Sequence, residues 1–163
     1  MPQNRADITQ FMQHQYLCET LTVKEIETLL EFTEAESHQR GDVIAEVGEV
    51  GEALFFLIKG RAELRQYSGE EHSVVGVIKA GEMMGEMSFF DRKPRSLSIV
   101  AAEDDTRLLK LTRAKYKRFR VEHPYITVNL LEHAIISQDH LFRDMAAKDA
   151  SLKQYILSMG GKR

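Results

Sequence analysis

The stretch from Ser37 to Leu111 constrains the fold of this chain more than any other part of the sequence. It consists of short runs rich in Val, Ile and Phe, and each run is interrupted by a glycine: Gly41, Gly48, Gly51, Gly60, Gly69, Gly76 and Gly81. Many short apolar segments with frequent turn residues are typical of an antiparallel jelly roll or barrel. We therefore predict a mainly β fold, with a compact antiparallel β-roll (a double-stranded β-helix) over residues 37–111.

Local signals place two of the turns in this β-roll. Ser68-Gly69 lies between two strand-like segments, which predicts the tip of a hairpin. The acidic run from Glu103 to Asp105 predicts the turn before a last strand over residues 107–111. We expect the remaining conspicuous glycines to serve turns only, with no part in a functional site: Gly48, Gly51, Gly60 and Gly81.

Helical patterns flank the β-roll on its N-terminal side. Apolar residues at helical spacing over residues 8–16 predict a short amphipathic lead-in helix. The run from Thr22 to Glu25 matches a capping box and predicts the start of a second helix with Ile26, Leu29 and Leu30 on its inner face. The predicted helical lead-in therefore covers residues 7–35.

The C-terminal part, residues 113–159, also has a helical pattern. Thr112 is a candidate N-cap for a first helix, and Pro124 is expected to begin a second and longest one that continues to about Lys148. Its apolar residues recur at alternating three- and four-residue steps, which predicts a seam for a partner helix: Leu131, Ala134, Ile135, Gln138, Leu141, Phe142 and Met145. Apolar positions over residues 152–159 predict a short last helix, stopped by Gly160-Gly161. We expect the whole chain, 1–163, to form one domain.

The segment from Gly81 to Val100 contains the candidate functional residues. Gly85 allows a tight turn, and the residues after it are expected to form one helical turn whose free N–H groups favour an anion. Arg95 follows Pro94 at the start of a strand, where its guanidinium is able to bind the same anion through two hydrogen bonds. Glu86 beside an anion site needs a neutral donor, and a ribose hydroxyl is the obvious candidate.

The motifs Gly85-Glu86-x-Ser88 and Pro94-Arg95-Ser96, with the glycine-rich run over residues 41–60, resemble the cyclic-nucleotide-binding domain family. The resemblance covers residues 21–141 and implies a β-roll fold with cAMP or cGMP as ligand. It also implies that Glu86 holds the ribose 2′-hydroxyl, that Arg95 holds the cyclic phosphate, and that the neighbouring cassette positions line the site: Gly85, Met87, Ser88, Ser96 and Leu97.

The sequence departs from the family pattern at three places. Leu97 stands where a small Ala is usual, and Met84 replaces the usual Phe before Gly-Glu. On the long helix, Leu141 and Phe142 align where a member of the family places a Thr-Ser pair against adenine. We therefore predict that Leu141 and Phe142 contact the base by stacking in place of hydrogen bonds.

Composition and motifs argue against several other functions. A net charge of −3 disfavours a domain whose main partner is nucleic acid, and the single cysteine, Cys18, excludes an internal disulfide and a multi-thiolate metal site. The chain lacks a nucleophile elbow, a zinc-protease helix motif and a P-loop, so we predict no enzyme, no metal and no cofactor. No apolar run reaches the length of a membrane span, and we expect a cytoplasmic protein without membrane contact. A basic cluster from Lys110 to Arg120 is interpreted as a solvated helix face.

We therefore predict a regulatory module that binds a 3′,5′-cyclic nucleotide, most readily cAMP, and signals through its C-terminal helices to a downstream effector protein. The long helix is expected to mediate a homodimer, with Gln138 bonding its mate across the two-fold axis. Only about fifteen residues follow Lys148, so we expect no direct DNA binding. Two alternatives stay open: a degenerate module that acts as a scaffold without nucleotide, and a fragment or partner of a larger transcription regulator.

Overall fold

The computed structural model of this protein describes residues 20–160. Within the last helix, the side chains at positions 140, 145, 151–153, 155, 156, 159 and 160 are outside the described part. The lead-in helix predicted over residues 8–16, and Cys18, also lie outside it.

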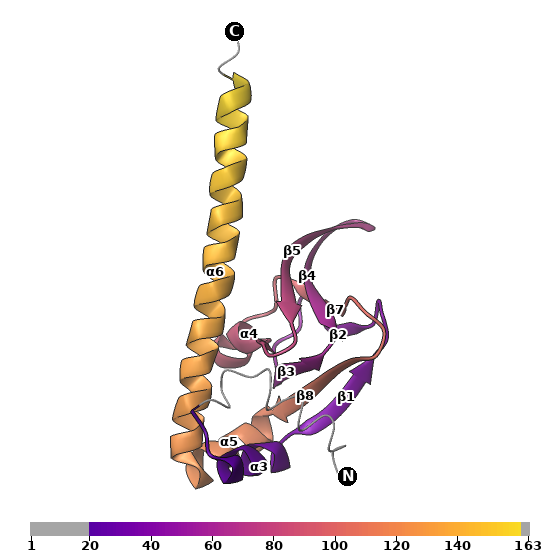
Figure 1. Cartoon of the computed structure of the whole chain (residues 1–163). Coiled ribbons are helices and arrows are strands. Elements are labelled where there is room, and N and C mark those ends of the chain that lie inside the picture. Colours follow the sequence, from indigo (N-terminus) through magenta and orange to yellow (C-terminus); the bar gives the residue numbers. More distant parts are fainter. Residues whose placement is uncertain (1–19, 161–163) are drawn as a thin grey trace.

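Two four-stranded antiparallel sheets form the β-roll, which lies to one side of the long C-terminal helix (Figure 1). The first sheet has the order β1 (Glu34–His38), β8 (Thr106–Thr112), β3 (Ala53–Lys59) and β6 (Met83–Met84). The second has the order β2 (Val43–Ala45), β7 (Ser98–Ala101), β4 (Arg61–Ser68) and β5 (Glu71–Lys79). The predicted antiparallel β-roll is confirmed, although its first strand begins at Glu34, inside the predicted helical lead-in.

Strand β3 is buried on both faces, because each face meets a different layer. Leu54, Phe56 and Ile58 belong to the hydrophobic core beneath the helices. The alternate residues Phe55 and Leu57 belong to the core between the two sheets. This two-sided burial explains why the sequence of β3 is a continuous apolar run without the alternation of a half-exposed strand.

The predicted turns and helix caps are also confirmed. Gly69 joins β4 to β5 with a φ of 68°, a conformation that glycine adopts without strain. Helix α3 (Val23–Glu31) begins with the capping box: the Thr22 side chain accepts from the Glu25 N–H, and Glu25 Oε1 accepts from the Thr22 N–H, both at 3.2 Å. Helix α5 (Arg113–Glu122) is capped by Thr112, whose hydroxyl accepts from the Lys115 N–H at 3.3 Å.

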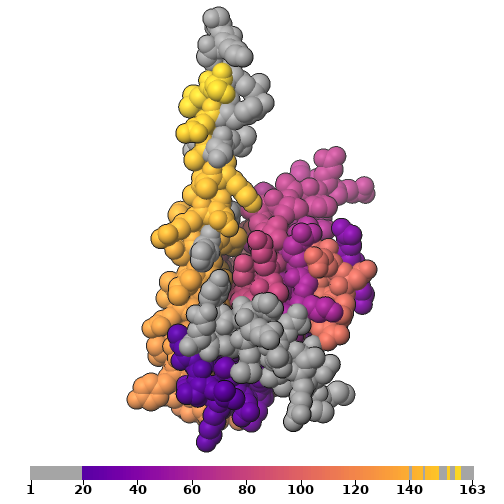
Figure 2. Space-filling model, in the orientation of Figure 1, coloured from indigo at the N-terminus to yellow at the C-terminus, as the bar shows by residue number. Residues whose placement is uncertain are grey.

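The last element of the described residues is one long helix, α6 (Pro124–Gly160), of 37 residues. The separate last helix predicted over residues 152–159 is therefore wrong. No Gly or Pro occurs between Tyr125 and Met159, so no residue in that interval ends the helix. Figure 1 shows α6 passing beside the β-roll and continuing well beyond it, and the space-filling view shows its C-terminal part standing clear of the strands (Figure 2). None of the helices in residues 20–160 is long and apolar enough to cross a membrane.

The predicted stripe on α6 is divided between two faces of the helix. Ala134 is buried, and Leu141 packs against the core between the sheets, close to Leu64 and Gly76. Ile135 and Phe142, by contrast, are 69% and 72% exposed. Part of the stripe therefore packs on the protein's own β-roll, and only the rest of it is exposed to a partner helix.

Candidate functional site

A cavity of about 780 Å³ lies between the β-roll, the inner face of α6 and the short helix α4 (Glu86–Asp91). Its volume is in the range of small-molecule sites, about 300–1,000 Å³. Eight of the nine predicted site residues line it: Gly85, Glu86, Met87, Ser88, Arg95, Ser96, Leu97 and Leu141. Phe142 is not among the lining residues, because at its position on α6 the side chain faces outward.

Gly85 sets the direction of α4 at the edge of this cavity. It is the N-cap of α4 with a φ of 86°, in the left-handed region that favours glycine. A Cβ at this position would lie 3.1 Å from Phe55 Cδ2 and 3.3 Å from Arg95 Nη2. The missing side chain therefore allows the backbone at the start of α4 to come close to Arg95. The first-turn N–H groups of a helix lack intrahelical acceptors, so they are free to bind an anion.

Backbone hydrogen bonds hold Arg95 beside the start of α4. Its N–H donates to the Glu49 carbonyl and its carbonyl accepts from the Gly48 N–H, both at 2.8 Å. Among residues 20–160, no group accepts a hydrogen bond from its guanidinium. Burial lowers the pKa of Arg95, while the charges of Glu49 and Glu86 act in the opposite direction. Because arginine stays protonated at any physiological pH, the cavity contains a cation with its donors free.

Glu86, the first residue of α4, is 4% exposed and faces the cavity. Its Oε2 accepts a hydrogen bond of 2.8 Å from Nε2 of Gln138 on α6, whereas its Oε1 has no partner in the described part of the chain. Burial raises the pKa of Glu86, while its own backbone N–H, the Ser137 hydroxyl, the Gln138 amide and the charge of Arg95 act in the opposite direction. The site thus offers one buried acceptor oxygen close to a cation.

The hydroxyl of Ser88 is engaged within the protein. It accepts from the Gly51 N–H at 2.7 Å and donates to the Lys93 carbonyl at 2.6 Å. These two bonds fix α4 to the segment before β3 and to the loop after α4. Of the polar groups of Ser88, only the backbone N–H therefore stays available to a ligand.

Two structurally important residues were not predicted from the sequence. Gly51 is more than a turn residue, because a Cβ on it would lie 2.8 Å from both Arg95 Nη2 and the Phe89 nitrogen. Arg113 was assigned to the solvated basic face, but its Nη2 donates to the carbonyls of Gly51 and Phe89, both at 2.6 Å. Its guanidinium also lies 4.3 Å from the centre of the Phe89 ring.

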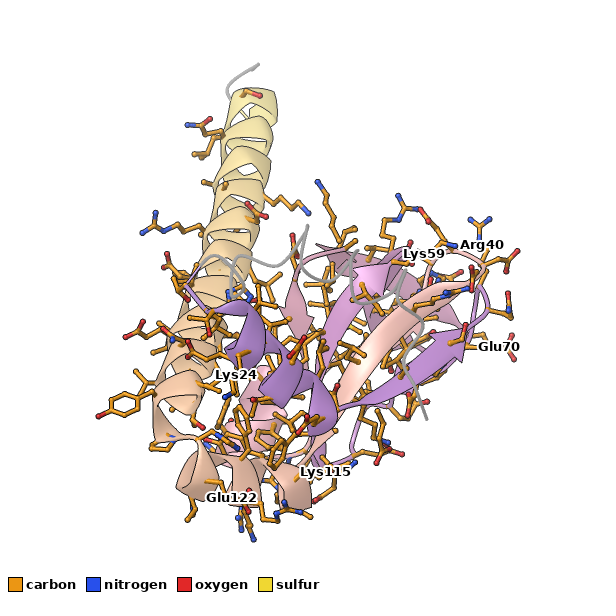
Figure 3. All side chains as sticks on the ribbon, turned by 60° about the horizontal axis from the view of Figure 1, so that its bottom comes forward. Lys24, Arg40, Lys59, Glu70, Lys115 and Glu122 are labelled. Atoms are coloured by element: carbon orange, nitrogen blue, oxygen red, sulfur yellow. The ribbon has the colours of Figure 1, made fainter. Side chains whose placement is uncertain are left out.

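Other basic residues of this cluster do lie at the surface. Lys115 pairs with Glu34 at 2.9 Å, and Arg118 pairs with Glu122 at 2.9 Å. In Figure 3, Lys115 and Glu122 lie on α5 at the lower edge of the molecule. No sequence signal distinguished Arg113 from these neighbours, since its acceptors come from distant segments.

The two ends of the cavity differ in chemistry. One part of the lining is apolar, belongs to the core between the sheets and suits a flat ring; it includes Leu64, Ile78, Leu97, Ile99 and Leu141. The other end, along the N-terminal half of α6, is lined by Asn129, Glu132 and His133. His133 is 7% exposed, its Nε2 has no hydrogen-bond partner among the described residues, and burial lowers its pKa.

Comparisons with known proteins agree with this geometry. A family model of the cyclic nucleotide-binding domain matches residues 35–123. Over 111 residues the chain is 32% identical to the cyclic AMP receptor protein of Thermus thermophilus, which covers 68% of this chain and 51% of that protein. Over 110 residues it is 30% identical to the cAMP-dependent protein kinase regulatory subunit of Mycosarcoma maydis, which covers 66% of this chain and 21% of that protein.

A solved structure shows the same fold. The cyclic nucleotide-binding domain from Methylobacillus flagellatus matches with a TM-score of 0.75 at 20% sequence identity, covering 88% of this chain and 80% of that chain. At this identity the likeness establishes the fold alone. The chain spans about half of the Thermus relative and about a fifth of the kinase subunit.

Proposed function

This chain belongs to the cyclic nucleotide-binding domain family, and we propose that its cavity binds a 3′,5′-cyclic nucleotide, with cAMP as the preferred ligand. The observation that carries the proposal is that Arg95 and Glu86 line the same cavity. Arg95 has free donors, and Glu86 Oε1 is a buried acceptor without a donor in the described part of the chain. A cyclic nucleotide supplies both missing partners, an anionic phosphate and a ribose 2′-hydroxyl, on one rigid ring system.

Each part of the cavity has a role in this proposal. Arg95 and the first N–H groups of α4 bind the cyclic phosphate, because a guanidinium and a helix N-terminus both favour an anion. Glu86 accepts the 2′-hydroxyl. The base lies at the apolar end, against Leu97 and Leu141, where dispersion and stacking replace specific hydrogen bonds. The preference for cAMP rests on the relatives, two of which are named for cAMP.

We assign no catalytic step to this cavity. The Ser88 hydroxyl donates its proton to a backbone carbonyl, so no base activates it as a nucleophile. Binding is the proposed activity, and occupancy is proposed to reach a downstream effector through α6.

We also propose that the outward face of α6 pairs with a second copy of this chain. Val128, Ile135 and Phe142 recur at seven-residue intervals and are all more than half exposed. This spacing keeps one apolar edge facing a partner helix.

The direct test of nucleotide binding is titration calorimetry with cAMP and cGMP, using 5′-AMP as the non-cyclic control. We expect cAMP to bind most tightly and 5′-AMP to bind weakly. A ligand at about 100 times its Kd should add about 2.7 kcal/mol to the free energy of unfolding. If neither cyclic nucleotide binds at millimolar concentration, the degenerate scaffold is the better description of this protein.

A further inference from the structure

Glu86 is held by a residue of the long helix that belongs neither to the α4 segment nor to the β-roll. Gln138 lies 52 positions further along the chain, and its Nε2 donates to Glu86 Oε2 at 2.8 Å. We propose that Gln138 is a positioning residue for the ribose: it holds Glu86 with Oε1 directed into the cavity, so that docking of α6 and recognition of the 2′-hydroxyl support each other. This inference rests on the proposed nucleotide-binding function.

The two carboxylate oxygens of Glu86 are in unequal situations. Oε2 is satisfied by Gln138, while Oε1 is buried without a hydrogen-bond partner among the described residues. A buried acceptor without a donor is costly, and a ligand hydroxyl in the cavity would remove that cost. Because the Gln138 bond occupies only one oxygen, a ribose hydroxyl that reaches the buried Oε1 would not need to displace the amide.

The amide of Gln138 also favours the ionised carboxylate. An N–H donor stabilises a charged acceptor more than a neutral one. An ionised Glu86 accepts a hydrogen bond from the 2′-hydroxyl more strongly than a protonated one does. Gln138 thus contributes to both the direction and the charge of the acceptor, and the neighbouring Ser137 hydroxyl acts on the charge in the same sense.

Other contacts fix the same turn of α6, so that the amide is presented in a defined place. The Ser137 hydroxyl donates to the Met83 carbonyl at 3.3 Å. Leu141, one turn further, packs near Gly76, where a Cβ would lie 3.0 Å from Leu141 Cδ1. Because coupling between two equilibria is reciprocal, a ligand that gains from Gln138 must also stabilise the docked position of α6.

The opposite coupling is a clear alternative. If the ribose needed both oxygens of Glu86, Gln138 would be a competitor that leaves when nucleotide binds. Removal of its amide would then tighten binding. The two mechanisms therefore predict opposite signs for the same substitution.

The test is a comparison of Gln138→Met with the parent, using two ligands that differ only at the ribose, cAMP and 2′-deoxy-cAMP. Methionine keeps the length of the side chain and removes the donor. Asp139→Asn is the matched control, because Asp139 is the next residue on the helix, is exposed and pairs only with Arg143 in the described part of the chain. Gln138→Asn, which keeps the amide on a shorter side chain, tests partial rescue. Kd values come from calorimetry.

We expect the parent to bind cAMP with a Kd roughly 10- to 100-fold lower than that of 2′-deoxy-cAMP. This ratio corresponds to the free energy of one hydrogen bond to a charged group. Gln138→Met should reduce this preference several-fold by weakening cAMP, with little effect on 2′-deoxy-cAMP, and Gln138→Asn should lie between the two. Asp139→Asn should match the parent with both ligands.

A Gln138→Met variant that loses affinity for both ligands by the same factor would assign the residue a structural role only, and one that binds cAMP more tightly would establish competition. Either result overturns the inference while nucleotide binding stands. A parent that binds neither ligand overturns the proposed function and this inference with it.

Discussion

Gly51 is the position where the smallest substitution should disturb the site most. An Ala Cβ would lie 2.8 Å from the Phe89 nitrogen, 3.0 Å from the Ser88 carbonyl carbon and 2.8 Å from Arg95 Nη2. Two of these three atoms belong to the backbone of α4 and are unable to move alone. The substitution Gly51→Ala should therefore displace α4 from Arg95.

The magnitude follows from two opposing contributions. Overpacking a tight site costs about 1–3 kcal/mol. Gly51 does not adopt a positive φ, so alanine is compatible with its backbone and reduces the entropy of the unfolded chain, which returns about 0.4–1 kcal/mol. The net loss is about 1–2 kcal/mol, which for a chain of this size lowers Tm by roughly 2–8 °C.

The assay combines thermal unfolding with cAMP titration. We expect Gly51→Ala to weaken cAMP binding by about tenfold or more, equivalent to at least about 1.4 kcal/mol. The reason is that the proposed anion site needs α4 and Arg95 to stay close together. The matched control is Gly69→Ala at the tip of the β4–β5 hairpin. There a Cβ meets nothing within 4 Å, but the φ of 68° makes the residue strained. This control should lose about 1 kcal/mol of stability with an unchanged Kd.

Parent-like stability and affinity in Gly51→Ala would refute the argument, because they would mean that α4 relaxes without leaving Arg95. Loss of stability without loss of affinity would place Gly51 outside the functional arrangement.

Three further predictions concern Arg95, Glu86 and α6. Arg95→Ala should weaken cAMP by roughly 30-fold to several thousand-fold, with Arg95→Lys recovering only part of it, in titration calorimetry; an unchanged Kd for Arg95→Ala would contradict the phosphate assignment. Burial raises the pKa of Glu86 above its ordinary 4.5. Between the unfolded and the folded pKa, the folded protein therefore keeps a proton that the unfolded chain has lost. The contribution of this group to the free energy of unfolding is complete at low pH and falls as pH rises through the folded pKa. Glu86→Gln should remove this fall from the profile of Tm against pH. A variant with the same profile as the parent would contradict the raised pKa of Glu86. Ile135→Glu with Phe142→Glu should convert a dimer into a monomer in light scattering, and a parent that is monomeric at micromolar concentration with or without nucleotide would contradict the paired helix.

Features encoded within a few neighbouring residues could be predicted from the sequence. The capping box at Thr22 and the hairpin tip at Gly69 depend on contacts between residues at most a few positions apart, and both are present. The β-roll itself was predicted from the short apolar runs between glycines, because that pattern has few other solutions. The separate last helix was predicted from a weaker apolar pattern after Lys148, although the sequence contains no residue there that stops a helix.

Contacts between distant segments could not be predicted from one sequence. Periodicity placed Gln138 on the stripe of α6, but it does not fix the rotation of the helix against the β-roll, and that rotation decides whether the amide meets a partner chain or Glu86. The contacts of Arg113 could not be predicted for the same reason, since its acceptors at Gly51 and Phe89 lie 62 and 24 positions away in the sequence. A basic residue among other basic residues gives no signal of burial.

The two faces of α6 provide a physical route for the proposed link between nucleotide and partner. Gln138 and Leu141 face the cavity, while Ile135 and Phe142, within the same two turns, face outward. A helix with a continuous hydrogen-bond ladder moves as a rigid unit over this distance, so any shift that improves the inner contacts also reorients the outer pair. The proposed dimer and the proposed nucleotide site are therefore parts of one equilibrium. Reciprocity then requires that a chain held as a monomer by Ile135→Glu and Phe142→Glu binds cAMP with a different Kd from the dimer, although neither substitution touches the cavity.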